Sequence, residues 1–450
     1  MPCNCLNKAE MNIRKNNGIG KVKKGKVVDM KQLTAIILGY GLRGQTYTAY
    51  SVKNPEELKI VAVAEKEESK RNYAKERHNL SDDMIFDDWK KLVALPKMAD
   101  FAIIATQDKM HVEPALACIE KGYNLLLEKP IAPTAEECKK ITLAAEQKGV
   151  KVIVCHVLRF TALFQTIKDI IDSGELGDIT SVIHTENVGN LHYSHSFVRG
   201  NWRNLEESSP MILAKSCHDT DIVQWLIGKK CTKVQSFGSL QYFTRKNQPI
   251  DAPDYCLDGC PYKEECVYNA ETFYMQAWEG WRNVVAGKVN ASDGEVLAAL
   301  KKGPYGRCVY ACDNDVVDRQ VVNMEFEDGC TVSFTMAAMN RGGRFIRIYG
   351  TRGELRASMA DGCKISVYNF QTEQIRKIDV NKMTESISDG HGGGDTGIMI
   401  DTIKAFSGQE PSKSITDIRT SYLNHLICFA AEESRLNYKV IDMDEFEKSI

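Results

Sequence analysis

The chain has 450 residues, 43% of them hydrophobic, which is enough for two packed domains of ordinary size. Its 58 basic and 60 acidic side chains nearly cancel and leave a net charge of −2. This balance gives no electrostatic reason to expect nucleic acid or an anionic membrane as a partner. No apolar run approaches the ~18–20 residues of a membrane span.

The first 29 residues are basic and polar, and they lack the apolar segment of a secretory signal. We expect residues 1–29 to form a disordered tail, or to precede a natural start at Met30. Without an export signal, we expect a cytoplasmic protein whose 15 cysteines are reduced.

Short apolar runs alternate with amphipathic stretches over residues 30–156, and such runs are typical of parallel strands buried on both faces. Between them the sequence predicts helices over Val112–Lys121 and Glu136–Lys148; the second has a capping-box spacing at Thr134 and Glu137 and ends at Gly149. This alternation predicts an N-terminal Rossmann domain with a doubly wound parallel sheet. The expected strands are Leu33–Leu38, Ile60–Ala64, Phe101–Ala105, Asn124–Leu127 and Val150–Cys155.

The pattern changes over residues 157–450, where consecutive strands are joined by short glycine turns. We predict a second α/β domain with a large, mostly antiparallel open sheet, so the fold class is α/β. The expected helices are Leu163–Ser173, Lys215–Ile227, Thr396–Ser407 and Ser421–Leu436. The expected strands are Ile179–Thr185, Val234–Phe243, Val316–Phe326, Cys330–Met336, Phe345–Gly350, Glu354–Ala357 and Lys364–Tyr368.

A glycine motif follows the first expected strand directly, with Gly39, Gly41 and Gly44 separated by Tyr40 and by Leu42-Arg43. The motif alone is a weak signal, but here it lies between a strand and a helix, where it binds the pyrophosphate of a dinucleotide. Glu65 ends the second expected strand, where its carboxylate can accept both ribose hydroxyls. It favours NAD, although Lys66 and Arg43 leave room for the 2′-phosphate of NADP.

Two further polar segments lie at the carboxyl ends of expected strands. Glu128-Lys129-Pro130 follows one strand, and Thr106 ends another, with His111 shortly after it. Ligands of open α/β sheets bind at this edge, so we expect Thr106, His111 and Glu128 to face the cofactor. Together with the glycine motif and a later helix start containing histidine, this ordered set resembles the glucose-fructose oxidoreductase/inositol dehydrogenase family (Gfo/Idh/MocA). The resemblance extends from about Met30 to near the C-terminus.

The resemblance implies that Lys129 is the active-site lysine, which hydrogen-bonds the reacting hydroxyl. An ammonium group beside a bound nicotinamide cation has a depressed pKa and can stabilise an alkoxide or shuttle its proton. The family pairs this lysine with a histidine, which His218 fits, and with an aspartate four residues earlier, where this chain has Ala214. Lys215 and His218 would share a face of the expected helix, so this lysine–histidine pair can replace the aspartate–histidine pair of the family. The alternative is that this departure has removed dehydrogenase chemistry.

The predicted substrate contacts combine a basic position, an acidic position and a polar loop. Arg159 resembles a basic position that the family has after its last Rossmann strand, and Asp221 fits a following acidic position. The loop His192–Arg203 is rich in the planar donors and aromatic rings that sugar sites use, so we expect it to supply contacts. Asp395, at the start of a helix, is either a further contact or a plain N-cap. The residues expected from the loop are His192, His195, Trp202 and Arg203.

These observations predict hydride transfer between a nicotinamide and a secondary hydroxyl of a sugar, sugar derivative or cyclitol. NAD is the expected cofactor, with NADP left open. One alternative is a glycoside hydrolase that keeps NAD bound and oxidises its substrate transiently. Another is a non-catalytic regulatory protein that responds to a sugar or dinucleotide. The resemblance also implies a homodimer or homotetramer.

A cysteine cluster lies in an insertion over about residues 247–312. Cys256, Cys260 and Cys266 are close in sequence, and Cys308 or Cys312 could supply a fourth thiol. Four such thiols could close a tetrahedral structural zinc site. Because the spacing is not the usual paired one, an iron–sulfur cluster and a local disulfide stay open, while a catalytic metal is disfavoured.

Overall fold

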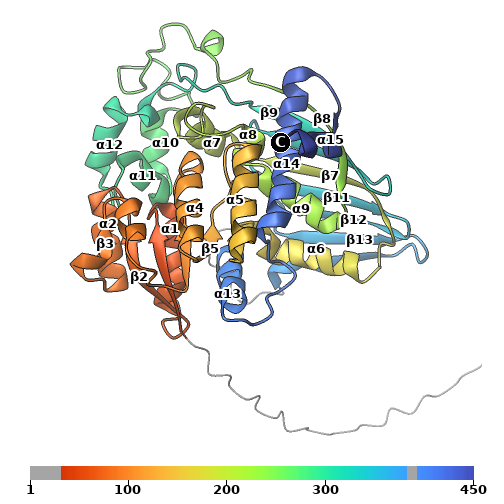
Figure 1. Cartoon of the computed structure of the whole chain (residues 1–450). Coiled ribbons are helices and arrows are strands. Elements are labelled where there is room, and N and C mark those ends of the chain that lie inside the picture. Colours follow the sequence, from red (N-terminus) through yellow and green to blue (C-terminus); the bar gives the residue numbers. More distant parts are fainter. Residues whose placement is uncertain (1–31, 383–392) are drawn as a thin grey trace, which may run out of the picture. The chain divides into compact units, whose positions relative to one another are not determined.

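Two sheets organise the chain, and the fold class is α/β, as the sequence predicts (Figure 1). The computed structural model describes residues 32–382 and 393–450. The expected tail over residues 1–29 therefore lies outside the described residues. Within the described ranges, no helix is long and apolar enough to cross a membrane.

The first sheet is parallel and has six strands in the order β3-β2-β1-β4-β5-β6, which is the doubly wound arrangement. It contains one strand more than the sequence analysis expected, because β3 has only two half-buried residues and gives no apolar run. The strands are β1 (Leu33–Leu38), β2 (Leu58–Ala64), β3 (Ile85–Phe86), β4 (Phe101–Ile104), β5 (Asn124–Leu127) and β6 (Val152–Val154).

Five helices connect these strands, and the caps of the last are the ones the sequence predicts. The Thr134 hydroxyl accepts a hydrogen bond from the Glu137 amide at 3.2 Å, and the helix ends at Gly149 with a φ of 67°. The helices are α1 (Leu42–Lys53), α2 (Glu68–His78), α3 (Trp89–Ala94), α4 (Val112–Glu120) and α5 (Ala135–Lys148).

The second sheet has nine strands in the order β14-β13-β12-β11-β7-β10-β9-β8-β15. Its neighbours are antiparallel except for β7 and β10, which confirms the mostly antiparallel prediction. The strands are β7 (Ile179–Asn187), β8 (Cys231–Ser239), β9 (Arg319–Phe326), β10 (Thr331–Ala337), β11 (Gly343–Gly350), β12 (Gly353–Ser358), β13 (Lys364–Asn369), β14 (Ile375–Asp379) and β15 (Ile441–Asp442).

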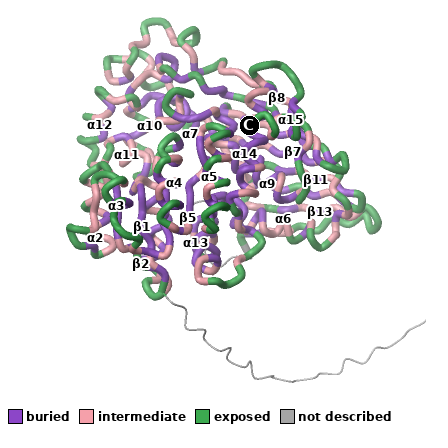
Figure 2. The backbone as a smooth tube through the Cα atoms, viewed as in Figure 1, coloured by how far each residue is buried: buried purple, intermediate pink, exposed green. Residues whose placement is uncertain are grey.

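Helices cover one face of the second sheet and also join it to the first (Figures 1 and 2). The long helix α14 packs on β8, on α9 and on α5, while α13 packs on α1, so the end of the chain contacts the N-terminal elements. One apolar core accordingly runs from β1 to β10. These helices are α6 (Ala162–Asp172), α9 (Cys217–Ile227), α13 (Gly394–Phe406), α14 (Ile418–Asn437) and α15 (Met443–Ser449).

The helix expected over Lys215–Ile227 begins later than predicted. A short helix, α8 (Met211–Ala214), ends immediately before Lys215, and α9 starts at Cys217. Lys215 and His218 therefore do not lie on one continuous helix, which corrects the predicted shared face. The interruption leaves the carbonyl of Ala214 without an intrahelical partner and available to another donor.

The insertion forms a small lobe that the sequence analysis did not resolve into elements. Its helices α10 (Ala270–Gln276), α11 (Glu279–Ala286) and α12 (Asp293–Lys302) pack around a separate apolar cluster that includes Tyr274, Val296 and Leu300. A short helix and a π-helical turn precede it in the chain, α7 (Asn190–Tyr193) and η4 (Ser194–Arg199).

Candidate active site

The glycine motif adopts the geometry that a bound pyrophosphate requires. Gly39 has a φ of +90°, and a side chain there would lie 2.6 Å from the Ala105 carbonyl oxygen. A side chain on Gly44 would lie 2.3 Å from the Gly39 carbonyl oxygen, so both glycines are needed for packing. A side chain on Gly41 would meet no atom within 4 Å, and no side chain caps the first turn of α1. Open space in front of uncapped amides fits a phosphate group.

Glu65 and Arg43 lie on opposite sides of this loop. The Glu65 carboxylate accepts hydrogen bonds from the amides of Tyr40, at 2.7 Å, and Glu67, at 3.0 Å. Arg43 donates instead to Glu128 at 2.6 Å and to Asp395 at 2.7 Å. Its charge is therefore offset by two carboxylates.

The Glu128-Lys129 segment is held from both sides. Burial alone would raise the pKa of Glu128, but the charges of Arg43 and Lys129 and a hydrogen bond from Tyr47 lower it overall. The Glu128 carboxylate accepts the Lys129 amide at 2.9 Å. Lys129 Nζ donates to the carbonyl oxygen of Ala214 at 2.8 Å. The lysine at the end of β5 thus contacts the interruption between α8 and α9.

His111 and Thr106 support this segment. The buried imidazole of His111 bridges the Pro130 carbonyl, at 2.7 Å, and the Thr106 carbonyl, at 3.1 Å. The Thr106 hydroxyl donates to the Met110 carbonyl at 3.0 Å. His111 therefore ties the loop after β4 to the loop after β5 and fixes the edge at which the cofactor would lie.

Lys215 pairs with a buried acidic residue that the sequence analysis missed. Its Nζ lies 3.4 Å from the carboxylate of Glu186, on β7. Burial lowers the pKa of Lys215 and raises that of Glu186, although each partner opposes the shift of the other. Arg344 joins them, 2.8 Å from Glu186 and 2.7 Å from Asp219. No sequence spacing indicates this network, because its members come from different strands and helices.

His218 lies at the start of α9 and is 9% exposed. Its ring meets that of His156 edge to face, with centroids 5.8 Å apart, and His156 meets His425 at the same distance. Burial lowers the pKa of His156 far below its usual value and that of His425 to about 3. The two imidazoles behind His218 are therefore neutral.

Arg159 and Asp221 bind each other. The guanidinium makes two hydrogen bonds to the carboxylate, at 2.7 and 2.6 Å, and the two residues are 3% and 0% exposed. Fully buried and mutually paired, they have no free charged face for a substrate. The structure places them as a support for α9 in place of the predicted substrate contacts.

The side chains of the polar loop His192–Arg203 contact two different sets of residues: aromatic side chains of the insertion and acidic side chains. His195 donates to or accepts from the Tyr274 hydroxyl at 3.0 Å, and its ring stacks on Trp281 at 4.5 Å; the ring of His192 lies 5.7 Å from Trp281. Both histidines thus pack against the insertion. Trp202 Nε1 donates to Asp108 at 3.1 Å, and Arg203 pairs with Glu207 and Asp313.

Two acidic residues have structural roles here: Asp108, which the sequence analysis did not select, and Asp395, which it considered as a contact or an N-cap. Asp108 accepts Trp202 and the hydroxyls of Ser208 and Ser209 at 3.2 and 3.0 Å, which joins the loop after β4 to the second domain. Asp395 lies in the first turn of α13, whose N-cap is Gly393, so it is not the N-cap that the sequence allowed. His391 and Gly392, just before this N-cap, lie outside the described residues.

The predicted zinc site is not supported. Within residues 32–382 and 393–450, no three His, Cys, Asp or Glu side chains are placed to hold a metal ion. The cysteines described there are all free thiols, so the local disulfide is not present either. The thiols of Cys256, Cys260, Cys266 and Cys308 nevertheless line one cavity, and Cys312 does not.

Together, the fold and the site define a dinucleotide-binding α/β protein with a lysine at the carboxyl edge of its parallel sheet. The family profile described as the NAD-binding Rossmann fold of the GFO_IDH_MocA oxidoreductases matches residues 33–156. The GFO/IDH/MocA C-terminal domain profile matches residues 164–356, so the two cover more than half of the chain. The chain belongs to the Gfo/Idh/MocA family.

Several bacterial relatives are similar in sequence. YteT of Bacillus subtilis (strain 168), whose name assigns it only to the oxidoreductases, is 24% identical over 69% of this chain and 73% of its own length. The scyllo-inositol 2-dehydrogenase (NADP(+)) IolW of the same organism is 31% identical over 38% of this chain and 44% of its own. The 2,7-anhydro-N-acetylneuraminate hydratase of Escherichia coli (strain K12) is 30% identical over 30% of this chain and 35% of its own.

Solved structures share the fold at low identity. A levoglucosan dehydrogenase in complex with NADH and L-sorbose aligns with a TM-score of 0.67 at 19% identity, covering 92% of this chain and 99% of that one. The WlbA dehydrogenase of Bordetella pertussis, in complex with NADH and UDP-GlcNAcA, aligns with a TM-score of 0.65 at 17% identity, covering 92% and 98%.

The glycine loop generates a sharp test. Replacing Gly41 with Val should leave the melting temperature of the cofactor-free protein close to that of the wild type, because the new side chain meets no protein atom within 4 Å. It should weaken NADH binding at least tenfold, about 1.4 kcal/mol, because it fills the space for the pyrophosphate. Thermal unfolding and NADH fluorescence titration measure the two effects.

Two glycines serve as controls for this variant. Gly294 on α12 also has open space around it, so Gly294→Val should change neither property much. Gly39→Val should prevent folding, because its side chain would overlap the Ala105 carbonyl. Wild-type NADH affinity in Gly41→Val would show that the pyrophosphate does not bind at this loop.

Proposed function

We propose that the protein transfers hydride between NAD and a secondary hydroxyl of a sugar, sugar derivative or cyclitol. The observation that carries the proposal is the position of Lys129, at the carboxyl end of β5 and hydrogen-bonded to Ala214 O at 2.8 Å. Ligands of open α/β sheets bind at this edge, at the point where the strand order reverses. A lysine there is placed to meet a substrate beside the dinucleotide.

The residues of the first domain fit the cofactor. The open space at Gly41 suits the pyrophosphate, and the Glu65 carboxylate at the end of β2 suits ribose hydroxyls. We favour NAD because Arg43 is neutralised by Glu128 and Asp395. When bound, the nicotinamide ring accepts or donates the hydride.

Lys129 is proposed to hold the reacting hydroxyl. An ammonium group has three donors, and one is used by the Ala214 carbonyl, which leaves donors for the substrate oxygen. A lysine so placed stabilises negative charge on that oxygen and moves its proton. Glu128 fixes the lysine by accepting its backbone amide.

His218 and Lys215 are proposed to complete the site. His218 would take or return the proton, and the neutral His156 packed behind it adds no positive charge. Lys215 would act through its pair with Glu186 in place of a direct contact with His218. The buried pair of Lys215 and Glu186 provides fixed charges close to Lys129. The positive charge of Lys129 in turn helps to lower the pKa of Lys215.

The names of relatives suggest the substrate class. IolW is an inositol dehydrogenase, and the complexes of levoglucosan dehydrogenase contain levoglucosan or L-sorbose. All are polyhydroxylated rings or sugars, which supports the proposed class. The E. coli hydratase, by contrast, is named for a reaction without net oxidation. The name of this relative supports a second candidate function, in which the present protein oxidises its substrate only transiently.

The proposal is tested by mixing the purified protein with NAD or NADP and a panel of sugars, cyclitols and glycosides. Growth of the reduced-nicotinamide absorbance in step with substrate would establish the dehydrogenase and name its substrate class. Product formation at constant absorbance would replace it with the transient-oxidation candidate. Tight NADH binding with no product from any panel member would favour a regulatory protein.

With an active substrate in hand, Lys129→Met should lower kcat by about 10²–10⁴-fold, because the substrate oxygen loses its charged donor. NADH affinity should change little. Lys97→Met is the matched control, since Lys97 lies before β4, at the opposite end of the sheet, where its Nζ donates to Gly122 O at 2.7 Å. A Lys129→Met variant that keeps wild-type kcat would refute the assigned role.

We also propose that the protein is a homo-oligomer formed through the open face of the second sheet. Apolar side chains from neighbouring strands lie exposed on this face. Phe237 pairs with Val321 across β8 and β9, and Phe345 follows on β11 in the same row. An exposed apolar patch of this kind is typical of protein interfaces. The exposed fractions are 51% for Phe237, 37% for Val321, 37% for Phe345 and 45% for Ile183.

Light scattering tests this assembly. The wild type should have the mass of a dimer or tetramer, and Phe237→Asp should shift the mass toward the monomer, because it places a charge in the contact. Tyr438→Asp is the control, because Tyr438 is 82% exposed at the end of α14 and is not part of the row of apolar side chains on the strands. A monomeric wild type, or an unchanged mass in Phe237→Asp, would contradict the proposal.

A further inference from the structure

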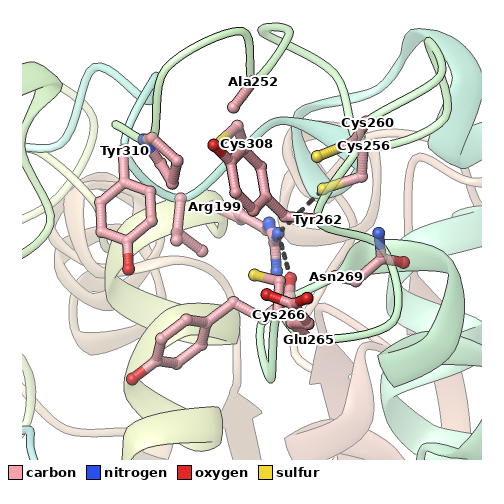
Figure 3. Close-up of a pocket in the computed structure, with 13 residues that line it drawn as sticks. Arg199, Ala252, Cys256, Cys260, Tyr262, Glu265, Cys266, Asn269, Cys308 and Tyr310 are labelled. Atoms are coloured by element: carbon pink, nitrogen blue, oxygen red, sulfur yellow. Dashed lines mark hydrogen bonds between the residues drawn. The ribbon is translucent and has the colours of Figure 1, made fainter. Parts of the chain in front are cut away.

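A cavity of about 220 Å³ opens within the insertion (Figure 3). Its lining includes the thiols of four cysteines, Arg199 and one carboxylate, Glu265, and it lies outside the proposed active site. Water occupies about 30 Å³ per molecule in the liquid, so the space admits a group much larger than a single ion. The thiols are those of Cys256, Cys260, Cys266 and Cys308.

The backbone brings these distant cysteines together. The residues before Cys256 and Cys308, Tyr255 and Arg307, form an antiparallel bridge. The Cys256 amide donates to the Gly306 carbonyl at 2.9 Å, and the Cys308 amide donates to the Asp254 carbonyl at 2.8 Å. Cys256 and Cys308 therefore lie diagonally across this bridge although their segments are far apart in sequence.

The other two thiols, those of Cys260 and Cys266, lie in turns. The amide of Lys263 donates to the Cys260 carbonyl at 3.3 Å, and that of Cys266 donates to the Tyr262 carbonyl at 2.9 Å. These turns bring Cys260 and Cys266 to the same cavity as Cys256 and Cys308.

Arg199 provides an independent indication of a bound anionic group. It is fully buried, at 0% exposure, and lines the cavity. Its Nε donates to the Arg307 carbonyl at 2.8 Å, and its Nη2 donates to the Tyr268 carbonyl at 2.7 Å and contacts Cys256 Sγ at 3.7 Å. Nη1 is buried and has no hydrogen-bond partner among the described residues. A buried cation in this state is costly unless negative charge lies nearby.

The arrangement of the thiols distinguishes a cluster from a single ion. Zinc binds thiolates at about 2.3 Å, which requires sulfur atoms within about 4 Å of one another. Within residues 32–382 and 393–450, no three cysteine, histidine or acidic side chains meet the requirements of one ion. Four thiols spread around a cavity fit a larger centre, since an iron–sulfur cluster is held by four cysteine thiolates.

We propose that Cys256, Cys260, Cys266 and Cys308 bind a [4Fe–4S] cluster beside Arg199. When a preassembled cluster binds, each thiol replaces one thiolate of the cluster's previous ligands: four iron–sulfur bonds form, four break, and the four thiol protons pass to the departing thiolates, with no net oxidation or reduction. The guanidinium offsets the negative charge of the thiolate-bound cluster and donates hydrogen bonds to its sulfur atoms. The centre fastens the bridge at Tyr255 and Arg307 to η4, the turn that also carries His195.

The test uses the full-length protein, purified without oxygen and then reconstituted with equal amounts of ferrous and ferric iron and with sulfide. About four iron and four acid-labile sulfide per chain are expected, with a broad visible absorbance that dithionite bleaches. The double variant Cys256→Ala/Cys308→Ala should lose most of the iron and sulfide. The matched control Cys312→Ala/Cys363→Ala also removes two thiols, neither of which lines the cavity, and should keep the wild-type content.

The wild-type measurement decides the proposal even if a variant fails to fold, which circular dichroism would detect. Stoichiometric zinc with no iron in the anaerobic protein would overturn it in favour of an ion. Failure of the wild type to take up iron and sulfide, with all four thiols open to alkylation, would show that the cavity holds no metal centre. Equal iron loss in both double variants would assign the cluster to other cysteines.

Discussion

The guanidinium of Arg43 joins three parts of the chain that are remote in sequence. It belongs to the glycine motif, and it binds Glu128 at the end of β5 and Asp395 in the first turn of α13. Both carboxylates are almost fully buried. A buried charge is costly unless it is paired, so the guanidinium of Arg43 stabilises the charged form of each. Because Glu128 also fixes the backbone of Lys129, the position of the proposed catalytic lysine follows from the same ion pair.

A second set of polar contacts places this lysine between the two sheets. Lys129 Nζ reaches the carbonyl of Ala214, which is free because α8 ends there. Asp108 accepts Trp202 beside it, and the Ile131 amide donates to His425 of α14 at 3.1 Å. The contacts come from loops and helix ends, where backbone groups lack partners of their own. At the position where the family has an aspartate side chain, this chain thus holds the lysine through the backbone carbonyl of Ala214.

Much of the fold and part of the site could be predicted from the sequence, because both rest on local signals. Buried parallel strands give apolar runs, and a cap requires a particular residue at a particular offset, as at Thr134 and Gly149. The glycine motif was identified for the same reason, since its three positions lie within one turn. By contrast, β3 has two half-buried residues and no pattern of its own. The interruption at Lys215 was also missed, since the neighbouring residues are compatible with a continuous helix.

Partners of buried charges could not be predicted, because sequence shows the type of a residue but not what faces it. Arg159 was expected to bind substrate, yet Asp221, 62 residues away, satisfies it in the core. Asp219 and Arg344 are 125 residues apart and meet only when α9 packs against the second sheet.

At the cysteine-lined cavity, too, local sequence signals show some features and leave others out. Spacing identified three of the lining thiols, left Cys308 and Cys312 open as the fourth, and suggested zinc, the usual ion for four thiolates. Arg199, a buried cation whose Nη1 has no partner among the described residues, favours a group with net negative charge, and any centre bound by four thiolates supplies one. The volume of the cavity favours a cluster, because one ion would leave most of this space empty. Neither the volume nor the buried cation can be seen in the cysteine pattern.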